Sequence, residues 1–469
     1  MKKLNIKESF KSKKFRYRGY SALLTIIVIG IAISANLIVN KFDLKYDMTQ
    51  NKLFSLSDQS YKVLRNLKNN VTIIGFYEAG KENESIKEVL NKYKKGSKKV
   101  TVEFKDPVKY PEFAKKYSKD GKTLTGGTLV VQSGNKYKTI DSNSLVNINY
   151  SANQVESYRV EQSITGAIMY AASDKSPVLY NLSGHDEEAL DTSVSSTIES
   201  GNYTVSDIDL LTENLDISKS NVLMVINPQR DLSGDELQKI SKFFKSGGRG
   251  MFVMGLLRNN LPNFNKLFSD YGIGFSKSII VEGNSKYSLQ NPIYLIPQMQ
   301  SHEILNPLKS SKLPVITPIA FPINQLNKKR QSVKVEPLLS TTSNSWGKKN
   351  LDATTAQKES GDTGGPFNVA VAVTDSNTNA KMVIISSGTF IDSNIVSSSK
   401  IGNVDFLMNS INWIQDNKEN ISIRPKSADA TYLNMSAFSE VLCSGLVVIV
   451  IPLIILVAGI IVWIRRKNL

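Results

Sequence analysis

Two long stretches without a charged residue, one near each end, constrain this chain most. Tyr20–Val39 reads YSALLTIIVIGIAISANLIV, and Val441–Ile464 reads VLCSGLVVIVIPLIILVAGIIVWI. At about 1.5 Å per helical residue, each stretch is long enough to cross a hydrocarbon core of about 30 Å. The sequence therefore predicts two transmembrane helices, over residues 20–40 and 441–464.

Two details of these stretches bear on that prediction. Pro452 lies inside the second stretch, where local adjustment of the helix or a neighbouring helix can satisfy the carbonyl group that it frees. A cleaved signal peptide is the alternative for the first stretch. However, the stretch is long for the apolar core of a signal peptide and lacks a clear small-x-small site before Asn36, so a retained anchor is expected.

The basic residues beside the spans predict the orientation of the chain. Short loops rich in Lys and Arg stay in the cytoplasm. Both termini are therefore expected in the cytoplasm of a cell whose plasma membrane holds the chain, with the body from about residue 42 to 440 outside. The basic residues concerned are Lys2, Lys3, Lys7, Lys11, Lys13, Lys14, Arg16 and Arg18 before the first span, and Arg465, Arg466 and Lys467 after the second.

The net charge of +16 comes mostly from the two ends of the chain. Between residues 42 and 464 there are 46 basic and 41 acidic residues, a balance that fits a body beside an anionic membrane or wall and gives little reason to expect a nucleic-acid partner. The single cysteine, Cys443, lies within the second span, so the body has neither a disulfide nor a thiolate site.

The first half of the body is expected to be a thioredoxin-like unit. Apolar runs and helical periodicity predict strands at 71–77 and 100–106, helices at 84–93 and 110–118, and a hairpin at 127–140. The order is βαβαββ. Where a redox enzyme of this kind has Cys-x-x-Cys, the chain reads Glu78-Ala79-Gly80-Lys81, which excludes thiol redox chemistry.

The second half predicts an α/β fold with a doubly wound parallel sheet, similar in topology to the glutamine amidotransferases. Apolar strands alternate with helices at 155–173, 186–200 and 233–246, the last with a capping box of Ser233 and Glu236 and a stop at Gly247. Prolines and a polar run mark an insertion with a mobile tip at about 283–366. No cysteine nucleophile and no Gly-x-Ser-x-Gly motif occurs in the body, so the sequence gives hydrolysis little support.

These features together predict the domain organisation of the chain. It comprises a basic cytoplasmic N-terminus (1–19), a transmembrane helix (20–40), a membrane-proximal helix with the thioredoxin-like domain (41–150), the doubly wound domain (151–425), a linker (426–440), a second transmembrane helix (441–464) and a basic tail (465–469).

Five short motifs, in this order, resemble those of the GldG-like family of auxiliary ABC-transporter components, first associated with gliding motility. They are Asp47-Met48-Thr49 with Phe54-Ser55-Leu56-Ser57; Ser183-Gly184-His185-Asp186-Glu187; Leu232-Ser233 with Glu236; Gly247-Gly248-Arg249; and Asn403, Asp405-Phe406, Asn409 and Trp413. The resemblance implies a multi-span ABC permease and a cytoplasmic ABC ATPase as partners. The family usually has Gly-His-Gly-Glu where this chain has Gly184-His185-Asp186-Glu187.

His185, Asp186 and Glu187 form the candidate ligand or partner loop, because they follow a strand at the edge where doubly wound sheets bind ligands. Without a second histidine or a cysteine nearby they predict no metal site, and no catalytic or cofactor residue is assigned. The simpler interpretation is that Asp186, Glu187 and Glu188 fill the first turn of a helix, where negative charge complements the dipole. Three functions stay open: a non-catalytic transport subunit, which is preferred; a surface hydrolase or glycan-processing enzyme using this loop; and a passive wall- or polysaccharide-binding module.

Overall fold

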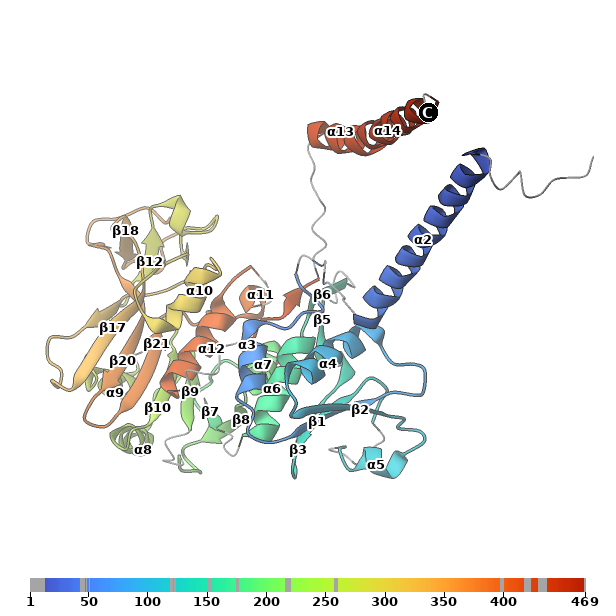
Figure 1. Ribbon diagram of the computed structural model, residues 1–469. Helices are drawn as coiled ribbons and strands as arrows, with labels where there is room; N and C mark the ends of the chain where they lie inside the picture. The colour runs from blue at the N-terminus through green and yellow to red at the C-terminus, as the bar shows by residue number, and fades with distance from the viewer. Residues whose placement is uncertain are drawn as a thin grey trace, which may run out of the picture. The chain divides into compact units, whose positions relative to one another are not determined.

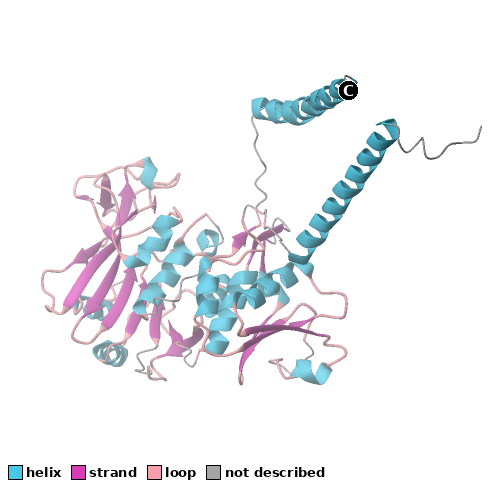
Figure 2. Cartoon of the chain, viewed as in Figure 1, coloured by secondary structure: helices cyan, strands magenta, loops and turns pink. Residues whose placement is uncertain are grey.

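The structure is a computed structural model with two compact units, Met1–Ser55 and Leu56–Leu469 (Figure 1). The strands form two main sheets, and helices pack on these sheets (Figure 2). The fold is therefore mixed α/β, as expected. The residues that it describes are 13–42, 47, 49, 51–118, 121, 124–149, 154–173, 177–215, 221–256, 260–396, 400–416, 423–428 and 437–467.

The N-terminal unit contains one long helix and a short turn. Helix α2, Lys13–Phe42, is 30 residues long and includes the predicted span 20–40. In the turn, the Asp47 carboxylate accepts hydrogen bonds from the backbone N–H groups of Thr49 (3.0 Å) and Phe54 (2.9 Å) and from the Ser55 hydroxyl (2.8 Å). The first motif of the resemblance is therefore a turn organised by one carboxylate.

Near the C-terminus, α13 (Ala437–Gly445) leads through a π-helical turn (Leu446–Val450) into α14 (Ile451–Lys467). The π turn directly precedes Pro452, and this is the kind of local adjustment that lets a helix tolerate proline. Among the described residues one helix is long and apolar enough to cross a membrane, at Leu446–Arg465, while Leu23–Ser34 is a shorter apolar stretch. The prediction of two spans is thus supported for the second and not for the first.

The smaller sheet has the strand order β2-β1-β3-β4. Strand β1 is parallel to β2 and antiparallel to β3, which pairs with β4 as a hairpin. Helix α6 packs against β3 and β4, and α3 and α4 contact each other beside it. The elements are α3 (Asp58–Arg65), β1 (Val71–Phe76), α4 (Glu84–Gly96), β2 (Val100–Lys105), α5 (Pro111–Lys115), β3 (Leu129–Ser133), β4 (Lys136–Ile140) and α6 (Val160–Ala172).

The helix predicted at 155–173 begins five residues late. Its first part is β6 (Gln154–Tyr158), the central strand of a small sheet with β5 (Val146–Asn149) and β22 (Lys426–Ser427). A strand from the far end of the chain pairs with this segment, and that long-range pairing overrides its local helical pattern.

The larger sheet has ten strands, with the main order β11-β16-β20-β21-β10-β9-β7-β8, and β17 pairs with β20 and β14 (Figure 1). Neighbours among β8, β7, β9, β10 and β21 are parallel, whereas β20 is antiparallel to β21. The prediction of a parallel sheet was therefore wrong for β20, which pairs antiparallel with β21. The parallel strands are β7 (Val178–Ser183), β8 (Thr204–Asp209), β9 (Val222–Ile226), β10 (Arg249–Val253) and β21 (Ala380–Ile385).

The parallel strands are covered on both faces. In β9, Val222, Met224 and Ile226 belong to one apolar core, and Leu223 and Val225 belong to the other. Alternate residues of a strand point to opposite faces, which explains why this run is apolar throughout. The flanking helices are α7 (Thr192–Ser200), α8 (Gly234–Lys245), α9 (Pro262–Ser269), α11 (Ser393–Val396) and α12 (Asn403–Ile414).

The insertion predicted at 283–366 is not a peripheral loop. Its strands β16 and β17 join the larger sheet, and its polar run, predicted as a mobile tip, supplies two strands that form a small sheet with β12. The elements of this region are β11 (Ile273–Phe275), β12 (Ile279–Glu282), β13 (Tyr294–Leu295), β14 (Gln298–Met299), α10 (Asn306–Ser310), β15 (Thr317–Pro318), β16 (Ile323–Gln325), β17 (Val333–Ser340), β18 (Ser345–Lys348), β19 (Thr363–Gly364) and β20 (Asn368–Asp375), with 3₁₀ turns at Ser285–Tyr287 and Glu303–Leu305. Another 3₁₀ turn, Ser142–Leu145, precedes β5.

Candidate functional site

The candidate site lies where the strand order of the larger sheet changes direction. Strand β7 continues through α7 to β8 on one side, and β9 lies on its other side. In doubly wound sheets, ligands bind at the carboxyl ends of the two strands that flank such a point. Here those ends are followed by the loops at residues 184–191 and 227–233, which contain the predicted site residues.

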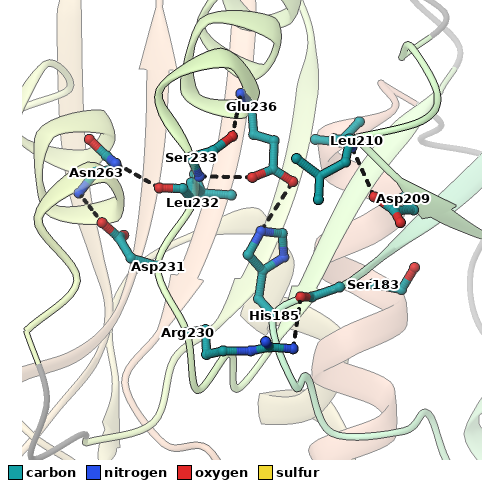
Figure 3. A network of polar contacts seen from close by, with 12 residues as sticks. Ser183, His185, Asp209, Leu210, Arg230, Asp231, Leu232, Ser233, Glu236 and Asn263 are labelled. Atoms are coloured by element: carbon teal, nitrogen blue, oxygen red, sulfur yellow. Dashed lines mark hydrogen bonds and ion pairs between the residues drawn. The ribbon is translucent and has the colours of Figure 1, made fainter.

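His185 lies at the centre of this point and is only 4% exposed. Its Nδ1 is 2.9 Å from Oε1 of Glu187, and its Nε2 is 3.1 Å from Oε1 of Glu236. Figure 3 shows the imidazole directed at the Glu236 carboxylate, which comes from α8. The structure thus brings together His185 and Glu187 of the candidate loop and adds Glu236.

The backbone of the loop that contains His185 is also held by hydrogen bonds. The His185 N–H donates to Oε2 of Glu187 at 2.8 Å, and the His185 carbonyl accepts from the N–H groups of Gln229 (2.9 Å) and Arg230 (3.0 Å). The loops after β7 and β9 are therefore joined by main-chain hydrogen bonds at the point where a ligand would otherwise enter.

Glu236 has two roles at once. As the third residue of α8 it accepts from the Ser233 N–H at 2.8 Å, while Ser233 Oγ accepts from the Glu236 N–H at 3.3 Å, which completes the predicted capping box (Figure 3). Its other carboxylate oxygen pairs with His185. The sequence revealed the cap, but no local signal in it indicated the contact with His185, because that contact depends on how the sheet folds.

The pKa shifts of His185 and Glu236 both favour the charged form of the side chain. Burial alone lowers the pKa of His185, but hydrogen bonds to Glu187 and Glu236 outweigh it and raise the pKa above its usual value. For Glu236, burial alone raises the pKa, but hydrogen bonds from Ser233 and His185 bring it below the usual value. The arrangement favours an imidazolium between two carboxylates.

Asp186 lies apart from this cluster. Its side chain is 62% exposed and its carboxylate pairs with Arg230, Oδ2 lying 2.7 Å from the guanidinium Nε. Its backbone has φ +56°. The predicted helix at 186–200 was wrong at its start, because α7 begins only at Thr192, with Asp191 as its N-cap. Asp186 and Glu187 are therefore not in the first turn of a helix, and the dipole interpretation does not hold.

A second helix, α9, is also bound to these loops. Asp231 accepts from the N–H groups of Asn263 (2.8 Å) and Phe264 (3.1 Å) in the first turn of α9, and the Asn263 side chain donates to the Leu232 carbonyl at 2.6 Å (Figure 3). The Phe264 ring meets His185 edge-on, with centroids 6.4 Å apart. The network thus joins two strands and two helices.

Chemically, this arrangement suits a structural role. Both imidazole nitrogens of His185 are occupied by carboxylates, which leaves neither for a metal ion or for a proton of a substrate. The described residues include no group of three or more His, Cys, Asp or Glu side chains arranged to hold a metal ion. The other histidine, His302, caps the 3₁₀ turn Glu303–Leu305 and packs edge-on against Trp413, with ring centroids 5.1 Å apart.

Two family models match the chain. One, described as an ABC-type uncharacterized transport system, matches residues 176–410, which is half of the chain and includes the whole network around His185. The other, described as a domain of unknown function, matches residues 50–147. No curated protein matches the sequence.

Solved structures give only distant similarities. The mmIFT52 N-terminal domain matches 52% of this chain and 99% of its own length, with 13% identity and a TM-score of 0.38. PurLQS from Thermotoga maritima matches 51% and 100%, with 10% identity and a TM-score of 0.25. The NTD_N/C domain of alkylhydroperoxide reductase AhpF from Enterococcus faecalis (V583) matches 30% and 56%, with 15% identity and a TM-score of 0.17.

Proposed function

This chain belongs to the ABC-type uncharacterized transport system family, and from this premise we propose that it is a non-catalytic auxiliary subunit that docks on an ABC permease. A cytoplasmic ABC ATPase bound to that permease supplies the energy. Within the family the chain is of the GldG-like kind, as its five motifs suggest. Its body presents two α/β domains outside the cell to other components of the complex.

One observation carries the non-catalytic part of the proposal. The point of the sheet where an enzyme of this architecture would bind its substrate is filled by the chain's own side chains, with His185 4% exposed and bonded at both nitrogens. Asp186 is the third residue that a hydrolase using this loop would need, and it forms an ion pair with Arg230 outside the cluster. An acid–base mechanism through these three residues therefore has little support.

The proposed architecture is a two-pass membrane protein with both termini in the cytoplasm. Its domains are a thioredoxin-like domain within 41–150 and a doubly wound, glutamine-amidotransferase-like domain within 151–425. The order β2-β1-β3-β4 supports the first, and the five parallel strands of the larger sheet support the second. Helix α2, at 30 residues, has the length to span even though its apolar stretch is short.

Small residues in the apolar helices provide the docking surface. Among the described residues, a side chain added at Gly30, Gly445 or Gly459 would meet no other side chain of its own unit within 4 Å. In membranes, helices associate closely where small residues let their backbones approach. The faces that carry these glycines are therefore open for a partner helix of the permease.

Co-purification tests the docking. We expect affinity-tagged full-length protein in mild detergent to retain a permease and an ATPase, and the G459L variant to retain at least tenfold less of both because the added side chain separates the helices. The matched control is I460L, which conserves volume at the neighbouring position. A wild-type chain that purifies alone in several mild detergents would contradict the proposal.

A further inference from the structure

The segment at residues 423–428, here called the strap, is attached to the body as an added strand. Within it, β22 pairs antiparallel with β6, Lys426 lying opposite Tyr158 and Ser427 opposite Ser157. Pro425 restricts the residue before it to extended conformations. This mode of attachment is the one by which many domains bind extended peptides at a sheet edge.

Two cations of the strap reach carboxylates of the body. Arg424 Nε lies 3.0 Å from Oδ1 of Asp405 on α12, and Lys426 Nζ lies 2.8 Å from Oε2 of Glu161 on α6. Glu161 is 4% exposed. Burial raises the pKa of Asp405, and Arg424 opposes that rise. Glu161 is thus a buried carboxylate and Asp405 a partly buried one, and a cation from the strap stabilises the charged form of each.

Glu161 also holds the beginning of α3. Its Oε1 accepts from the N–H and the hydroxyl of Ser57, the N-cap of α3, and from the hydroxyl of Ser60, each at 2.6 Å. Ser57 lies soon after α2 in the chain, and the strap lies shortly before α13. One buried carboxylate therefore binds both segments through which the body is connected to the terminal apolar helices.

Ile423 of the strap is buried, whereas Arg424 and Lys426 are only partly buried. A cavity of about 240 Å³ lies beside it, with Arg424 and Lys426 on one wall and Glu161, Asp405, Leu308 and Asn409 on the others. Withdrawal of the strap would open this cavity and leave the buried Glu161 and the partly buried Asp405 without their cations. The emptied site would accordingly take an extended segment with cations two positions apart, which lie on one face of a strand.

We propose that the strap is a reversible latch, which docks in cis on the site formed by β6, Glu161 and Asp405 and is released when the C-terminal helix pulls on it. Release frees Glu161 from Lys426 and loosens the start of α3. The latch thereby links the two membrane-proximal segments of the body. This inference goes beyond the proposed function and is independent of which partner the chain binds.

A peptide supplied in trans tests the latch. Full-length R424E/K426E protein in detergent, whose strap is repelled by Glu161 and Asp405, is titrated with a labelled peptide of residues 421–430, ISIRPKSADA. We expect this variant to bind the peptide at least tenfold more tightly than the wild type, whose own strap competes at high effective concentration. A peptide with Glu at both cationic positions should not bind.

Two further variants separate release from misfolding. The neutral R424Q/K426Q variant should also bind the peptide, and adding E161Q and D405N should abolish binding. Hydrogen exchange should be faster at the start of α3 in the released variants and return to the wild-type rate with peptide. The matched control K381Q, which removes the Lys381–Asp416 ion pair elsewhere, should not bind. Released variants with native exchange in β9 and β10 that fail to bind would overturn the proposal.

Discussion

The backbone at Asp186 adopts a left-handed conformation that most residues avoid. Its φ is +56°, a region where glycine has no penalty and where aspartate is among the better-tolerated alternatives. The GldG-like motif that this loop resembles usually has glycine at this place, whereas this chain has an aspartate, which pairs with Arg230. The departure from the motif is therefore compatible with the same loop shape.

We expect D186A to lower the free energy of unfolding by about 1–2 kcal/mol, because alanine pays the left-handed penalty without a compensating polar side chain. D186G should stay within about 0.5 kcal/mol of the wild type. Denaturant unfolding of the full-length protein in detergent measures both. R230A, which removes the exposed ion pair and the hydrogen bond from Arg230 to the Gly184 carbonyl, serves as the control, and equal losses for D186A and D186G would contradict the backbone argument.

His185 should make stability depend on pH. The pKa of His185 is raised in the folded protein. Its contribution to the free energy of unfolding is therefore fully present below the pKa of histidine in the unfolded chain, about 6.5, and is lost as pH rises through the folded pKa. The pKa of Glu236 is lowered from its ordinary value of 4.5. Its contribution to the free energy of unfolding is therefore present above pH 4.5 and is lost as pH falls through the folded pKa. The pair therefore stabilises most at about pH 5.5.

We expect H185Q to cost about 3 kcal/mol at pH 5.5, because it leaves two buried carboxylates without a cation, and to cost less at pH 9. Unfolding free energies of wild type and variant at both pH values measure the difference. The variant H302Q, at the other histidine, is the control for a general effect of losing an imidazole. If H185Q lowers the free energy of unfolding equally at both pH values, His185 does not stabilise the protein through its charge.

Local signals in the sequence predicted most elements. The apolar runs that became β1, β7, β9, β10 and β21 sit in the core, and the capping box of α8 formed as predicted. Short-range patterns suffice for these elements because burial or a cap within one turn decides them.

The elements that were wrong depend on distant parts of the chain. Residues 155–158 form β6 because β22, from beyond residue 425, pairs with them. Residues 186–191 stay non-helical because the Glu188 N–H donates to the Ile226 carbonyl of β9 and His185 pairs with Glu236 of α8. For the candidate site, His185 and Glu187 could be predicted from their adjacency, whereas Glu236 could not, because no local pattern reports a contact between two loops of a folded sheet.

At the scale of the whole molecule, cysteine labelling tests the two-pass architecture, since Cys443 is the single cysteine. In a C443S background we expect V108C, at a side chain 73% exposed, to react with a membrane-impermeant maleimide on intact cells without an outer barrier. N468C, in the tail, should react only after permeabilisation. V130C, at a position 0% exposed, is the control and should not react before denaturation. Labelling of N468C alone would invert the orientation.

The π-helical turn before Pro452 has a geometric consequence for whatever surrounds the C-terminal helix. The turn takes up one extra residue, so the two halves of the helix are rotated by about 100° relative to an unbroken α-helix. Gly445 and Gly459 would lie about 40° apart around an unbroken helix and instead lie about 140° apart. A straight neighbouring helix that packs on Gly445 would therefore not also pack on Gly459, so the two glycines lie on separate contact surfaces of this helix.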